Sequence, residues 1–301
     1  CVAFPFAAPW LSRQNWVPNY LGINTAMCEL FAMSSRYPTS VGFSLEALAR
    51  RGGLDGPHKD GWGVAYFEDS DVFLLRESSP AAESGLVRFM ETNGPPSNLV
   101  LSHIRLATQG EPVLRNTQPF QRELGGRAHV FAHNGNMPGI RDKCCLDSHR
   151  FRPIGETDSE FAFCCLLERL AALWDEAENT MPSVESRLEV VADFAAWLRP
   201  LGPFNFIYSD GDTLFVHAHR RTQDDGNIRP PGLHLLVRSC NEQAVDLTQS
   251  GVLLAPVAQE LVLVASVPLT GEPWESMEEG EVVALKQGVV WARTRAAAMG
   301  H

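Results

Sequence analysis

The sequence predicts an α+β protein built from layers of strands and helices. Short apolar runs rich in Val, Phe and Tyr recur at both ends of the chain, and two segments with helical spacing lie between them. Strands followed by helices and then by more strands favour this class over alternating βαβ units. With 45% hydrophobic and 20% charged residues, the composition is typical of a globular chain and excludes disorder of the bulk of the sequence.

The expected strands are short and bounded by Gly, Pro and Asp, a pattern typical of strands that bury at least one face. In the first half of the chain they are expected at 28–33, 63–67, 72–75, 99–104 and 129–133. In the second half they are expected at 204–208, 213–218, 233–237, 252–255, 261–267, 282–285 and 289–292.

Two helices are expected between these groups of strands. Large apolar residues of the first helix fall at i, i+4, i+7 and i+11: Phe163, Leu167, Leu170 and Trp174. Thr157 and Glu160 have the spacing of a capping box at its start. The second helix is expected over 184–198, with Pro200 ending it, and a shorter helix is expected over 44–51.

We expect one domain, at 28–295, because no repeat or long Pro/Gly/Ser linker divides the chain, and a tail over 296–301. Residues 1–27 are expected to be a leader or a non-native extension. This stretch has no basic residue before Arg13, unlike a secretory signal. Met27 stands directly before Cys28, so translation that starts at Met27 is the favoured interpretation.

The charge argues against nucleic acid as a partner. Lys and Arg number 25 against 36 Asp and Glu, which gives a net charge of −11, whereas a polyanion binder needs a cationic surplus. No apolar run approaches the roughly 18 to 20 residues of a membrane span. Seven cysteines are an odd and dilute set, which favours a reducing compartment and a cytoplasmic protein. Apart from Cys28, they are interpreted as small hydrophobes or surface thiols.

Four polar clusters sit at the ends of expected strands or at a helix start, where a rigid scaffold can present them: 60–63, 102–108, 132–135 and 155–160. Each alone has a plain structural interpretation. Arg105 follows an apolar strand and needs an anion, either a structural partner or a ligand carboxylate. Asn134 and Gly135 are typical of a tight turn. Asp158 in the first turn of a helix is favoured by the helix dipole alone.

Taken together and in order, the clusters resemble the glutaminase domain of class II glutamine amidotransferases. The main motifs are MCEL at 27–30, HKDGWG at 58–63, HIR at 103–105, HNG at 133–135 and GETDSE at 155–160. Further matches are PFN at 203–205, SDG at 209–211 and PLTG at 268–271. Within the family, the chain is most similar to the stand-alone YafJ-like branch. The resemblance spans nearly everything after residue 27.

The resemblance implies a four-layer αββα sandwich of the N-terminal nucleophile hydrolase type. It implies that Cys28 is the nucleophile once it becomes the first residue of the mature chain. Arg105 would bind the α-carboxylate of the substrate and Asp158 its α-ammonium. The side chain of Asn134 and the backbone N–H of Gly135 would form the oxyanion hole.

These residue types suit hydrolysis of the γ-carboxamide of glutamine or of a γ-glutamyl compound through a thioester. A Cys at the chain start carries a thiol and a free α-amine with a pKa of about 8, so one residue supplies nucleophile and base. Two fixed donors stabilise the oxyanion. If residues 1–27 stay attached, Cys28 has an amide nitrogen and this mechanism fails. The alternatives are a non-catalytic binding or scaffold subunit with a blocked Cys28, and an amidohydrolase specific for a γ-glutamyl conjugate.

The sequence departs from the family pattern after Arg105. Synthase-linked members commonly continue with Trp-Ala-Thr-His, whereas this chain has Leu106, Ala107, Thr108 and Gln109. Thr108 is kept and is expected to help orient the substrate. No synthase domain follows in this sequence, so we expect either a free-standing hydrolase or a subunit that passes ammonia to a separate synthase.

No cofactor or metal is expected. His217 and His219 fall on one face of an expected strand, a spacing that some metal sites use. Without a third ligand, a surface pair or a pair with satisfied hydrogen bonds is the favoured interpretation.

Overall fold

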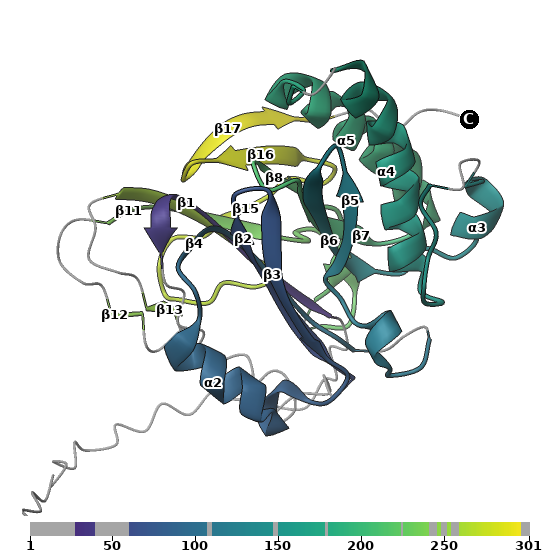
Figure 1. Cartoon of the computed structure of the whole chain (residues 1–301). Coiled ribbons are helices and arrows are strands. Elements are labelled where there is room, and N and C mark those ends of the chain that lie inside the picture. Colours follow the sequence, from purple (N-terminus) through teal and green to yellow (C-terminus); the bar gives the residue numbers. More distant parts are fainter. Residues whose placement is uncertain are drawn as a thin grey trace, which may run out of the picture.

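The computed structural model describes residues 28–39, 60–106, 110–146, 150–177, 180–223, 225–240, 246–247, 252–253 and 259–295. These residues form four layers, in which two antiparallel sheets lie face to face and helices cover both outer faces (Figure 1). The expected αββα sandwich is confirmed. Within the described part of the chain, no helix has the length and apolar character needed to cross a bilayer.

The first sheet has seven strands in the order β15-β11-β14-β1-β4-β2-β3. Their bounds are β1 Glu29–Thr39, β2 Trp62–Glu68, β3 Asp71–Glu77, β4 Ser97–Ile104, β11 His234–Cys240, β14 Gln259–Ala265 and β15 Glu275–Ser276. β1 lies between β14 and β4, with Glu29 opposite Ile104. This register places the residue before β1 beside the residues that follow β4.

The second sheet has six strands in the order β17-β16-β8-β7-β6-β5. Their bounds are β5 Phe120–Leu124, β6 Arg127–Gly135, β7 Phe204–Ser209, β8 Leu214–His217, β16 Val282–Lys286 and β17 Val289–Thr294. Two short hairpins stand apart, formed by β9 Arg221–Thr222 with β10 Ile228–Arg229 and by β12 Asp246–Leu247 with β13 Val252–Leu253.

Alternating side chains divide each strand between two cores. In β1, Leu30 and Ala32 are buried against the second sheet, while Phe31 and Met33 are buried on the outer face. The outer face of the first sheet packs on α2, Gly85–Asn93. The outer face of the second sheet packs on α4, Asp158–Glu176, and α5, Val184–Leu198. Because successive side chains of a strand point to opposite faces of the sheet, one apolar strand packs against the other sheet on one face and against the outer layer on the other.

Both central helices form where the sequence predicts them. Thr157 is the N-cap of α4, and its hydroxyl accepts a hydrogen bond from Glu160 N at 3.2 Å. The capping box is only half formed, because the Glu160 carboxylate instead accepts from Gly155 N at 2.6 Å and pairs with Arg122. α5 ends at Leu198, and a 3-10 turn over Arg199–Leu201 contains Pro200.

Some elements were not expected from the sequence: β5, α2, the four-residue helix α3, Ile140–Lys143, the 3-10 turns Ala81–Glu83 and Leu114–Asn116, and the short strands β9, β10, β12 and β15. Of the strand expected over 252–255, only Val252–Leu253 is described as a strand. The expected helix over 44–51, residues 1–27 and the tail 296–301 lie outside the described residues.

One cysteine prediction is wrong. Cys144 and Cys165 form a disulfide with a Cα–Cα distance of 6.9 Å, so they are neither small hydrophobes nor free thiols. Cys144 directly follows α3, which packs on α4, where Cys165 lies. The pairing follows from the packing of two helices and not from cysteine spacing. Cys145 is exposed and Cys164 is buried, both free, as expected.

Candidate active site

Cys28 directly precedes β1 and lies beside the residues that follow β4. Its Sγ is 3.2 Å from both the backbone N and the backbone O of Leu106. Burial raises the pKa of the Cys28 thiol to about 11, while the Leu106 backbone N–H and the charge of Arg105 act to lower it. A thiol with this pKa is protonated at neutral pH, and the Leu106 N–H stands ready to stabilise the sulfur as negative charge develops.

Asn134 and Gly135 end β6 in the second sheet. The side-chain amide Nδ2 of Asn134 donates to the backbone O of Cys28, so this contact joins the ends of the two sheets. Asn134 is fully buried, and its Oδ1 has no hydrogen-bond partner among the described residues. Gly135 has φ of +151°, and a Cβ added there would lie 1.9 Å from Pro203 O. Only glycine fits at this position.

Arg105 directly follows β4 and is only 3% exposed. Its guanidinium donates from Nη1 to Glu111 O at 3.0 Å and to Asp60 O at 3.4 Å, and from Nη2 to Gly110 O at 3.1 Å. Burial lowers the pKa of Arg105, and Cys28 in its thiolate form and the Asp60 carboxylate act against that shift. The guanidinium is therefore held in place by backbone carbonyls and carries its charge beside the thiol.

Asp158 is the first residue of α4 and is 7% exposed. Its Oδ2 accepts from Met137 N at 2.8 Å, and its Oδ1 accepts from Ser159 N at 2.8 Å. Met137 is two residues beyond Gly135. The Asp158 carboxylate thus fastens the chain that leaves β6 to the N-terminus of α4.

His133 and Gln118 support this junction from inside. His133 Nδ1 lies 2.9 Å from Ser159 Oγ, and Gln118 donates from Nε2 to His133 O at 3.2 Å and accepts from His133 N at 2.6 Å. Burial lowers the pKa of His133 to about 4, with Asp158 acting against the shift. The ring is therefore neutral at neutral pH, and it braces the helix start that carries Asp158.

The structure brings together five of the six residues singled out in the sequence. Cys28 contacts Asn134, and the pKa of Cys28 is affected by both Arg105, which lowers it, and Asp158, which raises it. Gly135 follows Asn134 directly. Thr108 lies outside the described residues.

Sequence reasoning missed several residues that build the site. Leu106 acts through its backbone, so no side-chain pattern could reveal it. Ser159 and His133 lay inside recognised clusters but had no separate role. Gln118 and Asn116 are buried amides in a loop, and nothing in their neighbourhood distinguishes them from ordinary turn residues.

His217 and His219 do not form a metal site with the other described residues. His217 Nδ1 lies 3.0 Å from Glu281 O, and His219 Nε2 lies 3.4 Å from Glu279 Oε1. Both rings are buried, not on the surface. Across the described ranges, no group of three or more His, Cys, Asp and Glu side chains could hold a metal ion.

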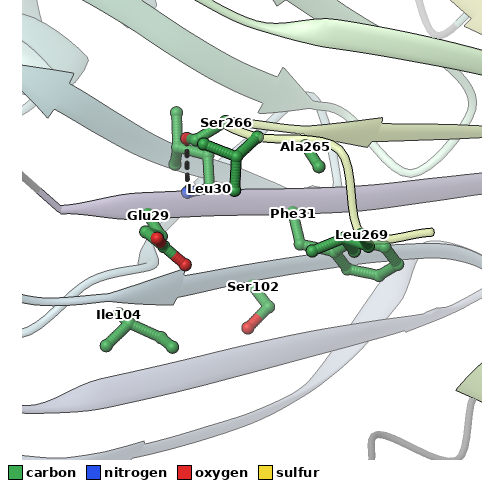
Figure 2. A pocket seen from close by; sticks show the side chains of 9 residues that line it. Glu29, Leu30, Phe31, Ser102, Ile104, Ala265, Ser266 and Leu269 are labelled. Carbon is green, nitrogen blue, oxygen red and sulfur yellow. Dashed lines mark hydrogen bonds between the residues drawn. The ribbon is translucent and has the colours of Figure 1, made fainter. Parts of the chain in front are cut away.

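A small hollow adjoins the site on the outer face of the first sheet (Figure 2). Its lining includes Glu29, Phe31, Ile104 and Leu269. Figure 2 also shows the bond from Leu30 N to Ser266 Oγ, 2.9 Å long, which fixes the start of β1 against the end of β14. Cys28 does not line this hollow; its contacts are with Leu106, which follows β4, and with Asn134 of the second sheet.

Comparison with known proteins identifies the family. The family model described as class II glutamine amidotransferases matches residues 27–300. The chain belongs to the class II glutamine amidotransferases. YafJ of Escherichia coli K12 is 36% identical over 256 residues, covering 85% of this chain and 96% of YafJ.

Two further relatives agree with this assignment. A protein of Haemophilus influenzae named as a glutamine amidotransferase is 34% identical over 268 residues, covering 87% of this chain and 85% of its own length. The 2.0 Å crystal structure of a predicted glutamine amidotransferase from Pseudomonas aeruginosa PA01 superimposes with a TM-score of 0.63. It is 32% identical, and the match covers 88% of this chain and 100% of that one.

Proposed function

We propose that this protein hydrolyses the γ-carboxamide of glutamine, or of a γ-glutamyl compound, through a thioester on Cys28. In the proposed active form, Cys28 is the first residue of the mature chain. The observation that carries the proposal is the contact of the buried Asn134 amide with the backbone O of Cys28, because it puts a buried hydrogen-bond donor next to the residue that carries the thiol.

The reaction begins with attack of the Cys28 sulfur on the carboxamide carbon. The free α-amine of a chain-start residue, with a pKa of about 8, accepts the thiol proton. Because the pKa of the thiol, about 11, lies above that of the amine, this transfer is unfavourable by itself and is completed only as the carbon–sulfur bond forms. The Leu106 N–H, 3.2 Å from the sulfur, lowers the cost of that transfer. The same amine then gives the proton to the departing ammonia.

Two donors stabilise the tetrahedral oxyanion in this proposal, the Asn134 amide and the Gly135 backbone N–H. Collapse of the intermediate breaks the carbon–nitrogen bond and leaves a γ-glutamyl thioester. Water, activated by the now neutral α-amine, attacks the thioester and releases the acid. Ammonia, or another amine, is the first product.

Recognition of the glutamyl head is assigned to Arg105 and Asp158, with Thr108 helping to orient the substrate. A guanidinium fork binds a carboxylate through two parallel bonds, and a carboxylate binds an ammonium group. Both groups are common to every γ-glutamyl amide, so the leaving amine is left unspecified. Released ammonia either diffuses away or is used by a separate synthase.

The test compares two chains, one beginning at Cys28 and one containing all 301 residues. Ammonia release is measured with glutamine and a small panel of γ-glutamyl amides, and the first residue of each protein is checked by intact mass. We expect turnover only by the chain that begins at Cys28, and none by its Cys28→Ala variant. A matched Cys145→Ser variant, at an exposed thiol, should be fully active. An inactive chain beginning at Cys28 would favour a non-catalytic binding subunit.

A further inference from the structure

Asn116 connects the two segments that would bind the charged head of the substrate. It is fully buried at the end of the 3-10 turn Leu114–Asn116. Its Nδ2 donates to Glu111 O at 3.1 Å, and its Oδ1 accepts from Glu156 N at 2.9 Å. One amide group therefore joins the loop after Arg105 to the residue two before Asp158.

The Glu111 carbonyl shows how the first of these segments bears on Arg105. This oxygen accepts both from Asn116 Nδ2 and, at 3.0 Å, from Arg105 Nη1. The adjacent carbonyl of Gly110 accepts from Arg105 Nη2 at 3.1 Å. The loop that Asn116 holds is thus the loop that holds the guanidinium.

Asn116 also fixes the segment that leads into Asp158, through its contact with Glu156. Glu156 N is fixed by Asn116 Oδ1, and the next residue, Thr157, is the N-cap of α4, whose first residue is Asp158. The position of Glu156 therefore sets where the helix begins and where the Asp158 carboxylate lies. A shift of Asn116 would move this start relative to Arg105.

Two glycines pack closely against the Asn116 amide. A Cβ on Gly110 would lie 2.8 Å from Asn116 Nδ2, and a Cβ on Gly155 would lie 2.3 Å from Asn116 Oδ1. Backbone approaches the amide from both sides, so a larger residue at either position would displace it. The amide is held in one orientation by its hydrogen bonds and by this packing.

We infer that Asn116 is a positioning residue that sets the spacing between Arg105 and Asp158, and thereby the preference for substrates with both an α-carboxylate and an α-ammonium. This inference rests on the proposed function, because it takes these two residues as the groups that bind the head. A substrate with only one of the two charges does not require that spacing. Loss of the Asn116 side chain should therefore lower kcat/KM for glutamine more than kcat/KM for substrates that carry only one of the two charges.

The test measures ammonia release by the wild-type chain and by Asn116→Ala with three amides. These are glutamine, glutaramic acid, which lacks the α-ammonium, and 4-aminobutanamide, which lacks the α-carboxylate. For glutamine, kcat/KM should fall about tenfold to hundredfold, mainly through KM, since buried backbone groups lose their partner. For the two truncated amides the fall should stay below about threefold. Equal losses for all three amides would overturn the inference, because a general structural role predicts them.

A matched control lies at the neighbouring residue. Arg115 joins the same two segments through exposed side chains, with its Nη2 2.7 Å from Glu156 Oε1 and 3.8 Å from Glu111 Oε2. Arg115→Ala should leave all three kcat/KM values within about twofold, because exposed ion pairs contribute little. If Asn116→Ala does not fold, Asn116→Ser keeps one hydroxyl for hydrogen bonding and takes its place.

Binding of the acid products separates this inference from the proposed function. Calorimetry with L-glutamate and with glutarate requires no turnover, so it applies even to a chain that releases no ammonia. The substitution at Asn116 should weaken L-glutamate binding about tenfold or more and glutarate binding less than threefold. Absence of ammonia release by the wild-type chain would count against the proposed function. Equal weakening for the two acids would count against the role of Asn116.

Discussion

Replacing Asn134 with alanine should lower kcat for glutamine about 10²- to 10³-fold, which corresponds to about 3 to 4 kcal/mol of transition-state stabilisation. This side chain is fully buried, and its Nδ2 donates to the Cys28 backbone O. Removing it deletes one of the two proposed oxyanion donors and leaves Arg105 and Asp158 in place. KM should therefore stay within about threefold of the wild-type value.

The assay is ammonia release at saturating and at limiting glutamine, with thermal unfolding measured on the same samples. Loss of a buried hydrogen-bond partner costs about 1 to 3 kcal/mol of stability, so the variant should still fold. The hydrogen bond from Asn205 Nδ2 to the Asn134 backbone O, 3.3 Å long, is retained. Asn98→Ala is the control, because the Asn98 amide also donates to a backbone oxygen, that of Arg36, at the opposite end of β4 from Arg105. A folded Asn134→Ala protein with unchanged kcat would refute the oxyanion role.

Three further predictions follow from the same structure. Arg105→Lys should raise KM for glutamine at least tenfold in steady-state kinetics, because an ammonium group cannot reproduce the guanidinium fork, and a near-normal KM would count against the assignment. Burial lowers the pKa values of His129, His133 and His217 from 6.5 to about 4, 4 and 3, so the unfolded chain binds protons more readily. Their contribution to stability is complete above about pH 6.5 and is lost as the pH falls toward 4. The Tm of His217→Gln should therefore fall less steeply over this pH range than the Tm of the wild-type chain. Equal slopes of Tm against pH for the two proteins would contradict the reasoning. Cys144 and Cys165 are separated by 21 residues, so reduction of their disulfide should lower the free energy of unfolding of the wild-type chain by about 3 kcal/mol. The same reducing treatment should leave the free energy of unfolding of Cys144→Ser unchanged. An equal decrease in both proteins would exclude this pairing.

Strongly periodic elements were predictable from the sequence. The helices that became α4 and α5 carry apolar residues at helical spacing and clear end signals, Thr157 at one start and Pro200 past the other end. Most strands were apolar runs because both sheets are buried on two faces, as in β4 and β7. In such strands composition alone indicates the element.

Weakly apolar elements were not predictable. β5 has the sequence Phe-Gln-Arg-Glu-Leu, and only its two ends are buried, so its pairing with β6 stabilises it more than its own composition does. α2 depends on Val87 and Met90 packing against the first sheet. Tertiary packing decides such segments, and a local window of sequence does not contain that information.

In the candidate site, too, some residues could be predicted from the sequence and others depend on tertiary packing. Cys28, Arg105, Asn134 and Asp158 were found through a family resemblance, since nothing in their separate strands shows that the two sheets meet at one end. Asn116 went unnoticed because its role depends on which carbonyl and which amide N–H lie within about 3 Å of one buried amide. The Cys144–Cys165 disulfide likewise depends on helix packing.

The most direct test of the central claim is covalent trapping with 6-diazo-5-oxo-norleucine, a γ-glutamyl electrophile, followed by peptide mapping. The chain that begins at Cys28 should acquire one adduct, on the Cys28 sulfur, and lose its ammonia-releasing activity in proportion to labelling. An adduct on any other residue would contradict the account, as would turnover by a chain that still carries residues 1–27.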